Sequence, residues 1–99
     1  MKTATKWDAF EYLETEEDMA AYLNAALEEG DTSVIAAALG DIARAKGMTQ
    51  LSKETGITRD GLYKALSPTG NPSFDTVQKV VRAFGLKLGV AVTTAQLSE

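Results

Sequence analysis

Four polar side chains near the middle of the chain have types and spacing that suit contact with DNA. They are Arg59, Asp60, Tyr63 and Lys64. Their spacing of i, i+1, i+4 and i+5 places them on one face of a helix. The two cations can donate to guanine O6 and N7 or to phosphate. The aspartate can accept from cytosine N4, and the tyrosine can contact a thymine methyl group or a phosphate. The pattern predicts a surface that reads double-stranded DNA.

The residues around this cluster, 48–66, predict two short helices joined by a tight turn. Thr49 is the expected cap of the first helix, Gly56 ends it in the left-handed conformation, and Thr58 caps the second. Such a pair forms a helix-turn-helix, whose second helix fits a DNA major groove about 12 Å wide. Gly61 costs the second helix about 1 kcal/mol relative to alanine. Either a close approach to the DNA backbone or a packing requirement would account for it.

The loop SPTGNPSF at 67–74 leads from this unit into the next helix. Pro72 directs the chain into a helix that Ser73 is expected to cap. Backbone amides at a helix start bind phosphate, and the side chains of Asn71 and Ser73 can add hydrogen bonds. A plain linker between two helices has the same composition, so both interpretations stay open.

Three longer helices must support these residues, and their apolar spacing predicts them over 15–30, 31–47 and 73–85. Thr15, with Asp18 three residues later, is the expected cap of the first. The stripes expected to face the core are, in chain order, Met19, Tyr22, Leu23, Ala26 and Leu27; Ile35, Ala38, Leu39 and Ile42; and Phe74, Val77, Val81 and Phe84.

After Gly85 the apolar period changes to two, which predicts a short C-terminal β-strand over 86–92. A lone strand leaves its backbone groups unpaired and is not stable by itself. Its partner can be Lys2–Trp7, the same strand of a second subunit, or a sheet edge of another protein. The strand of a second subunit is the preferred dimer element, and the polar tail 93–99 is expected to be flexible.

Charge is distributed unevenly along the 99 residues, which suffice for one domain and carry a net charge of −4. Residues 1–31 hold two basic and nine acidic residues, a net −7, whereas residues 32–99 hold eight basic and five acidic residues, a net +3. The first segment suits a basic partner and the second an acidic one. Alternatively, the acids only solvate an amphipathic helix.

Several functional classes are excluded or disfavoured by composition. The chain has no cysteine and no histidine, which excludes disulfides, zinc–thiolate sites and Ser–His or Cys nucleophiles. No apolar run approaches the roughly 18 residues of a membrane span, and the N-terminus lacks the apolar core of a signal peptide. Paired acids such as Glu16 and Glu17 could serve acid–base or metal chemistry, but no pocket-forming glycine motif accompanies them. We therefore expect a cytoplasmic protein without membrane contact, catalytic residues, metal or other cofactor.

Two resemblances extend this interpretation. Residues 32–85 resemble the lambda-repressor-like group of phage-repressor helix-turn-helix domains. Nearly the whole chain is similar to the addiction-module antidote proteins of bacterial toxin–antitoxin pairs. The similar pieces are EYLETEEDMAAYLNAALEEGD at 11–31 and IAAALGDIARAKGMTQLSKETGITRDGLYKALSPTGNPSFDTVQKVVRAFGLKL at 35–88, of which LYKALSPTGNPSF is the most specific part.

The resemblance implies a mainly α fold, a lambda-repressor-like bundle of about five helices with the short C-terminal strand. It implies an antitoxin that binds and silences a small basic toxin of the RelE/ParE type. The antitoxin would also repress its own operon as a homodimer on an operator. Residues 1–30 would then be an acidic arm and toxin-binding helix, 31–92 the DNA-binding domain with its strand, and 93–99 the tail.

The residues expected to carry these roles fall into two sets. The DNA contacts are Thr49, Gln50, Thr58, Arg59, Asp60, Tyr63, Lys64, Asn71 and Ser73, although Gln50 lies directly before Leu51, closer than in the general repressor pattern. The toxin contacts are Glu16, Glu17, Tyr22, Glu28 and Glu29. Two other functions stay open: a stand-alone repressor without a toxin partner, and a scaffold that binds only proteins.

Overall fold

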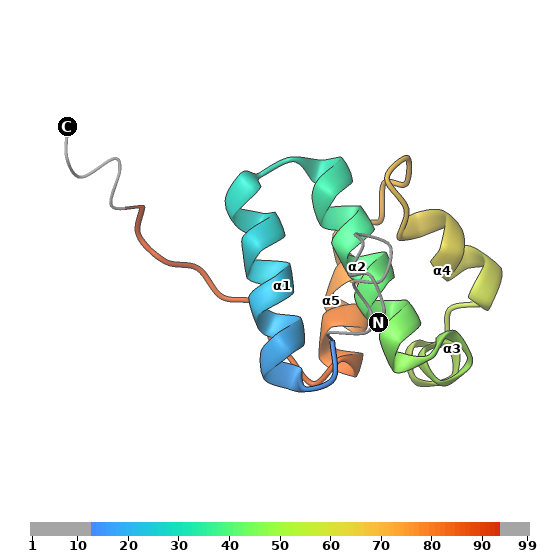
Figure 1. Cartoon of the computed structure of the whole chain (residues 1–99). Coiled ribbons are helices and arrows are strands. Elements are labelled where there is room, and N and C mark those ends of the chain that lie inside the picture. Colours follow the sequence, from blue (N-terminus) through green and yellow to red (C-terminus); the bar gives the residue numbers. More distant parts are fainter. Residues whose placement is uncertain (1–12, 94–99) are drawn as a thin grey trace, which may run out of the picture.

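Five helices make up the regular structure of the part of the chain that the computed structural model describes, residues 13–93. In chain order they are α1 (Glu16–Glu29), α2 (Thr32–Lys46), α3 (Met48–Thr55), α4 (Arg59–Ala65) and α5 (Phe74–Ala83) (Figure 1). The expectation of a mainly α protein with about five helices is confirmed. The candidate strand Lys2–Trp7 and residues 94–99 of the tail lie outside the described residues.

Local capping determines where α1 and α2 begin. Thr15 Oγ1 accepts from the Asp18 amide at 3.0 Å, and Asp18 Oδ2 accepts from the Thr15 amide at 3.1 Å, which completes a capping box. The backbone donors of Thr15 and Glu14 lower the pKa of Asp18. Gly30 ends α1 with a φ of 77°, and the next residue, Asp31, caps α2. This short connection makes α1 and α2 antiparallel neighbours.

The predicted cap of α3 is wrong. Helix α3 begins at Met48, one residue before Thr49, and it has no side-chain cap. Gly47, with a φ of 108°, is both the C-cap of α2 and the N-cap of α3. The N-cap position of α3 is therefore a glycine, which has no side chain to accept from the first amides of the helix.

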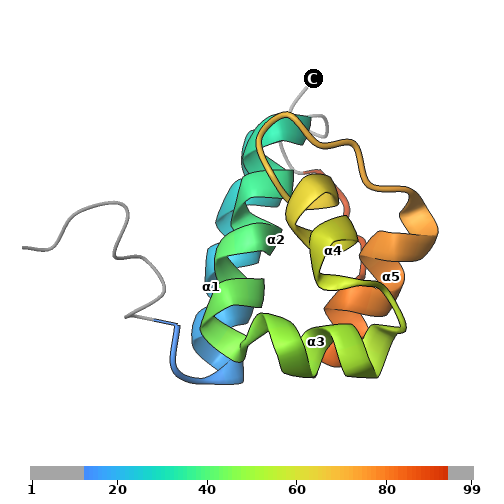
Figure 2. The same cartoon turned by 90° about the vertical axis from the view of Figure 1, so that its right-hand side faces the viewer.

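The core lies around α2, which packs against α1 on one side and against α3 and α4 on the other, while α5 packs against α3 (Figures 1 and 2). The largest fully buried side chains of the core are Leu39, Ile42, Leu51, Leu62, Leu66, Val80, Val81 and Phe84. None of the helices formed by residues 13–93 is long and apolar enough to cross a membrane.

Two residues of the predicted apolar stripes face solvent instead of the core. Leu27 is 40% exposed and Phe74 is 70% exposed. Leu27 lies in the last turn of α1 and Phe74 is the first residue of α5, so each extends beyond the edge of the core. Periodicity assigns a residue to a face of a helix but does not say how far the neighbouring helices reach.

The predicted C-terminal strand is not formed in this single chain. Residues 86–93 run without regular structure, and Leu86 donates to the Val81 carbonyl at 3.1 Å as the chain leaves α5. Leu86 and Leu88 are half-buried against the core, as the alternation predicts. A strand needs a partner for its backbone groups, and none lies alongside among residues 13–93.

Candidate functional site

The turn between α3 and α4 is held by hydrogen bonds from small polar side chains. Gly56 ends α3 with a φ of 77°, as predicted. Ser52 Oγ donates to the Ile57 carbonyl at 2.6 Å, and Thr58 Oγ1 accepts from the Gly61 amide at 3.0 Å, which confirms Thr58 as the cap of α4. These bonds give the two short helices a defined relative orientation.

Gly61 has a packing explanation. A Cβ atom there would lie 3.1 Å from Thr58 Oγ1 and 3.3 Å from Ile57 Cγ2, closer than most Cβ contacts. The turn between α3 and α4 therefore crowds this position through side-chain atoms, which favours a small residue here without any contact to DNA.

Helix α4 is anchored by one face and exposes the other. Leu62 and the following Leu66 are fully buried. All four residues of the predicted DNA-reading face are exposed on α4: Arg59, Asp60, Tyr63 and Lys64. Lys64 Nζ lies 3.2 Å from Asp60 Oδ2, and both side chains are 78% exposed. The structure thus brings this set together on an open surface, which we call the α4 face.

Two close backbone contacts hold the C-terminal end of α4. Gly40 of α2 lies so near the Leu66 carbonyl oxygen that a Cβ atom would overlap it. Gly70 is equally close to the carbonyls of Lys64 and Ala65, so the loop after α4 folds directly onto the end of the helix. Both positions accept only glycine without displacement of the backbone.

The other predicted DNA contacts lie on the elements that flank α4. Thr49 and Gln50 are exposed at the start of α3, where Gln50 Nε2 donates to Glu54 Oε2 at 2.9 Å. Asn71 is exposed in the loop, and Ser73 caps α5 by accepting from the Thr76 amide at 3.1 Å. The Ser73 side chain is therefore already used by its own helix.

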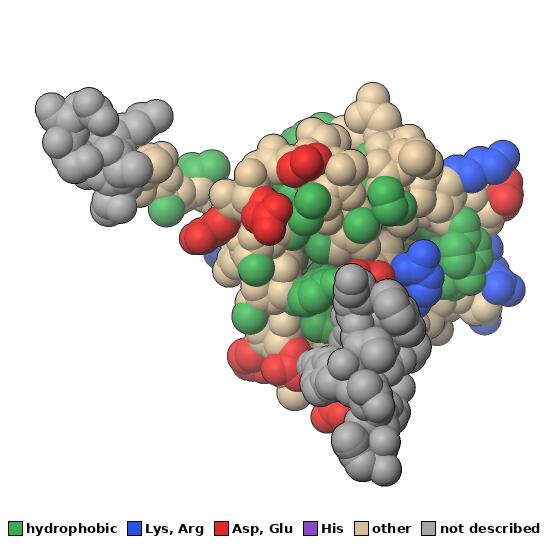
Figure 3. Space-filling view, turned by 45° about the horizontal axis from the view of Figure 1, so that its top comes forward, with side chains coloured by type: hydrophobic (Ala, Val, Ile, Leu, Met, Phe, Trp, Pro, Cys, Tyr) green, Lys and Arg blue, Asp and Glu red, His purple; other side chains and the backbone are tan. Residues whose placement is uncertain are grey.

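The predicted toxin contacts all lie on α1, which has five acidic residues and no basic one. Four are exposed, namely Glu16, Glu17, Glu28 and Glu29, and Tyr22 is half-buried. Glu28 and Glu29 occupy the last turn, where the helix dipole disfavours negative charge. Figure 3 shows acidic side chains mostly on the side of α1 and basic ones on the side of α4.

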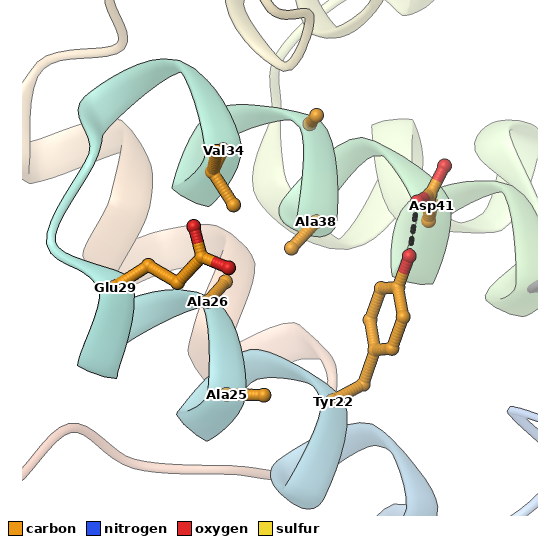
Figure 4. Close-up of a pocket in the computed structure, with 8 residues that line it drawn as sticks. Tyr22, Ala25, Ala26, Glu29, Val34, Ala38 and Asp41 are labelled. Carbon is orange, nitrogen blue, oxygen red and sulfur yellow. Dashed lines mark hydrogen bonds between the residues drawn. The ribbon is translucent and has the colours of Figure 1, made fainter. Parts of the chain in front are cut away.

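A shallow groove of about 300 Å³ lies between α1 and α2, and we call it the α1–α2 groove. Small apolar side chains, mostly alanines, form its floor, and Glu29, Tyr22 and Asp41 stand at its rim (Figure 4). Tyr22 Oη donates to Asp41 Oδ2 at 2.6 Å. Burial of the tyrosine is the main cause that raises the pKa of Tyr22 to about 12, and the hydrogen bond to Asp41 is the second.

Sequence reasoning missed Asp41 and Phe74. Asp41 is 19 residues from Tyr22, and no local pattern predicts their contact. Phe74 has the spacing of a core residue, so its exposure next to Ser73 follows only from the position of α5 in the fold.

Comparison with known proteins identifies the family. Residues 3–92 match the family described as "Probable addiction module antidote protein". An uncharacterized protein of Haemophilus influenzae is 51% identical over 84 residues, which cover 85% of this chain and 87% of that protein. The chain belongs to the addiction module antidote family. No solved structure matches it.

Membership of the antidote family implies a toxin partner of some kind. The match begins before α1 and ends after α5, so it includes both the acidic helix and the α4 face. Among the described residues, no group of acidic side chains is arranged to hold a metal ion.

Proposed function

We propose that this protein is the antitoxin of a bacterial type II toxin–antitoxin module. It neutralises a small basic toxin of the RelE/ParE type by direct binding, and it represses its own operon by binding operator DNA. The observation that carries the DNA-binding half of the proposal is the α4 face, which is exposed and projects from a fully buried anchor. Family membership supports the toxin-binding half.

Helices α3 and α4 act in this proposal as a helix-turn-helix of the lambda-repressor type, with α4 in the major groove. Arg59 and Lys64 contact bases or phosphates, and Tyr63, which is 43% exposed, packs against the groove wall. Lys64 must first leave Asp60. Because both side chains are 78% exposed, opening this surface pair costs at most about 1 kcal/mol.

The residues on either side of α4 extend the contact along the DNA backbone. Thr49, Gln50 and Asn71 are exposed, and the amides in the first turn of α5 that Ser73 does not cap can bind a phosphate. One such unit reads only a few base pairs, so we expect a homodimer that binds two half-sites about 34 Å apart.

Titration of the chain with DNA from upstream of its gene, over a series of salt concentrations, tests this half of the proposal. Lys64→Ala and Arg59→Ala should each weaken operator binding by about 1–3 kcal/mol. Lys79→Ala is the matched control, because Lys79 also pairs with an aspartate four residues earlier, at 3.2 Å, but lies on α5. Equal affinity of wild type, Arg59→Ala and Lys64→Ala would contradict the assignment.

The acidic face of α1 and the α1–α2 groove form the proposed toxin contact. Acids in the last turn of α1 oppose the helix dipole, and a cationic partner would relieve that unfavourable interaction. The apolar floor of the groove can accept the aliphatic part of an arginine or lysine while Glu29 at its rim pairs with the charge. Asp41 already accepts from Tyr22 and pairs with Arg44 at 3.4 Å, so Glu29 is the acid of this groove assigned to the toxin.

Copurification from the native host provides the decisive test for the toxin. A stoichiometric small basic protein should accompany the chain, and its repeated absence would favour a stand-alone repressor. Glu29→Gln and Glu17→Gln should slow association with this protein and reduce its salt dependence. Glu54→Gln, an exposed acid on α3, is the control and should leave the association rate unchanged.

A further inference from the structure

Three polar side chains connect α1 to the side of α2 on which α4 packs. Helix α2 lies between α1 and α4 (Figure 1). Tyr22 belongs to α1, and Asp41 and Arg44 lie one turn apart on α2. We call these three residues the α2 bridge. Arg44 has no part in the DNA contacts or the toxin contacts proposed above.

Asp41 uses its two carboxylate oxygens for different partners. Oδ2 accepts from Tyr22 Oη at 2.6 Å (Figure 4), and Oδ1 pairs with Arg44 Nη1 at 3.4 Å. The bond from Tyr22 is short and charge-assisted, whereas the pair with Arg44 is long and its side chains are 33% and 46% exposed. Tyr22 therefore fixes the carboxylate of Asp41, and this carboxylate in turn orients the guanidinium of Arg44.

The guanidinium of Arg44 lies close to the C-terminal end of α4, because Gly40, one turn earlier on α2, has no side chain. A Cβ atom on Gly40 would lie 3.4 Å from Arg44 Nη1 and would overlap the carbonyl oxygen of Leu66. Leu66 is the C-cap of α4, and the carbonyl groups at the end of a helix carry partial negative charge. A cation in this place stabilises the end of α4.

The end of α4 depends on such support because the helix is short. It has seven residues, and its C-cap is not the left-handed glycine that ends α1 and α3. Its last turn carries Lys64, and Tyr63 precedes it on the α4 face. A shift of this end therefore moves both side chains away from the positions in which they contact DNA.

We propose that Arg44 is a positioning residue for operator binding, and that Tyr22 holds it in place through Asp41. Arg44 acts on DNA through the end of α4 and not by contact with a phosphate. This inference rests on the proposed function, which places α4 in the major groove. It extends the DNA-reading unit beyond the helix-turn-helix to α1, on the other side of α2.

Titration with operator DNA over a series of salt concentrations tests the proposal. Tyr22→Phe changes no charge and should weaken operator binding about threefold, and Arg44→Ala should weaken it about three- to tenfold. Neither change should alter the slope of log affinity against log salt concentration, whereas the loss of one phosphate contact lowers that slope by about one. Arg82→Ala is the matched control, because Arg82 is also an exposed arginine in the last turn of its helix, and it should bind within about twofold of wild type.

The double variant Tyr22→Phe/Arg44→Ala tests the order of the residues in the α2 bridge. Because Tyr22 acts through Arg44, this variant should bind no more weakly than Arg44→Ala alone. Additive losses would overturn the proposal. Wild-type affinity of Tyr22→Phe, or a salt slope lowered by about one in Arg44→Ala, would also overturn it.

Amide hydrogen exchange of the free protein gives a measurement without DNA. The Leu66 amide donates to the Leu62 carbonyl at 2.9 Å. Its exchange should accelerate at least about threefold in Tyr22→Phe and in Arg44→Ala, relative to the amide of the buried Val80 on α5. Equal acceleration at both amides indicates a general loss of stability and overturns the proposal. If the exchange at Leu66 responds as expected but wild type does not bind the operator, the proposed function fails, whereas the support of α4 by Arg44 stands.

Discussion

Replacement of Gly40 by alanine tests whether α2 supports the end of α4 through direct backbone contact. Gly40 is buried in the interior of α2, and a Cβ atom there would overlap the carbonyl oxygen of Leu66. A backbone oxygen cannot rotate away as a side chain can. Gly40→Ala must therefore move the two helices apart.

Two energies of opposite sign determine the result. Alanine is about 1 kcal/mol more favourable than glycine inside a helix, so propensity alone would stabilise the variant. Overpacking against a backbone group costs about 1–3 kcal/mol. We expect a net decrease of up to about 2 kcal/mol in the free energy of unfolding, which lowers Tm by roughly 4–8 °C for each kcal/mol in a domain of this size.

Urea and thermal unfolding followed by circular dichroism measure this change, and titration with operator DNA measures the accompanying shift of α4. Gly61→Ala is the control, because its nearest obstacles are side-chain atoms 3.1 and 3.3 Å away that can move. It should stay within about 1 kcal/mol of wild type. An increase in stability for Gly40→Ala would refute the reasoning, because helix propensity alone would then account for it.

Three further predictions concern the core, the tyrosine of the α1–α2 groove and the acidic helix. Leu62→Ala should lower the free energy of unfolding by about 2–5 kcal/mol, because it empties a fully buried site, and urea denaturation measures the loss. Tyr22→Phe should cost about 1 kcal/mol at neutral pH through loss of the bond to Asp41. The pKa of Tyr22 is raised in the folded protein from 10.0 to about 12, so this contribution is complete below pH 10 and is lost as the pH rises towards 12. The difference between the two proteins should shrink over that range in alkaline unfolding curves, and a constant difference would contradict the assignment. Added toxin should tighten operator binding at low salt, because it masks the acidic segment that repels DNA; gel-shift titrations that show no increase in affinity would argue against this coupling.

Local signals in the sequence predicted most helix ends and most of the core. Thr15 with Asp18, Thr58 and Ser73 are caps as expected, because a cap depends only on residues within one turn. The α4 face was predicted for the same reason: Leu62 and Leu66 fall on one side of a short helix, so the polar residues must fall on the other.

The errors came from features that neighbouring elements decide. Thr49 is not a cap because α2 runs directly into α3 at Gly47. Leu27 and Phe74 are exposed because the core ends before them. The segment 86–92 has the alternation of a strand, yet a strand forms only where a second segment pairs with it.

The sequence by itself determined the helix periods, the caps, the glycine turns and the separation of acidic from basic residues, since these depend on residue type and short spacing. Only the tertiary structure decided that Gly40 and Gly70 enclose the end of α4, that Tyr22 bonds to Asp41, and that Glu28 and Glu29 line different grooves. Such contacts join residues distant in the chain, and their existence depends on how closely the helices approach, which no local pattern encodes.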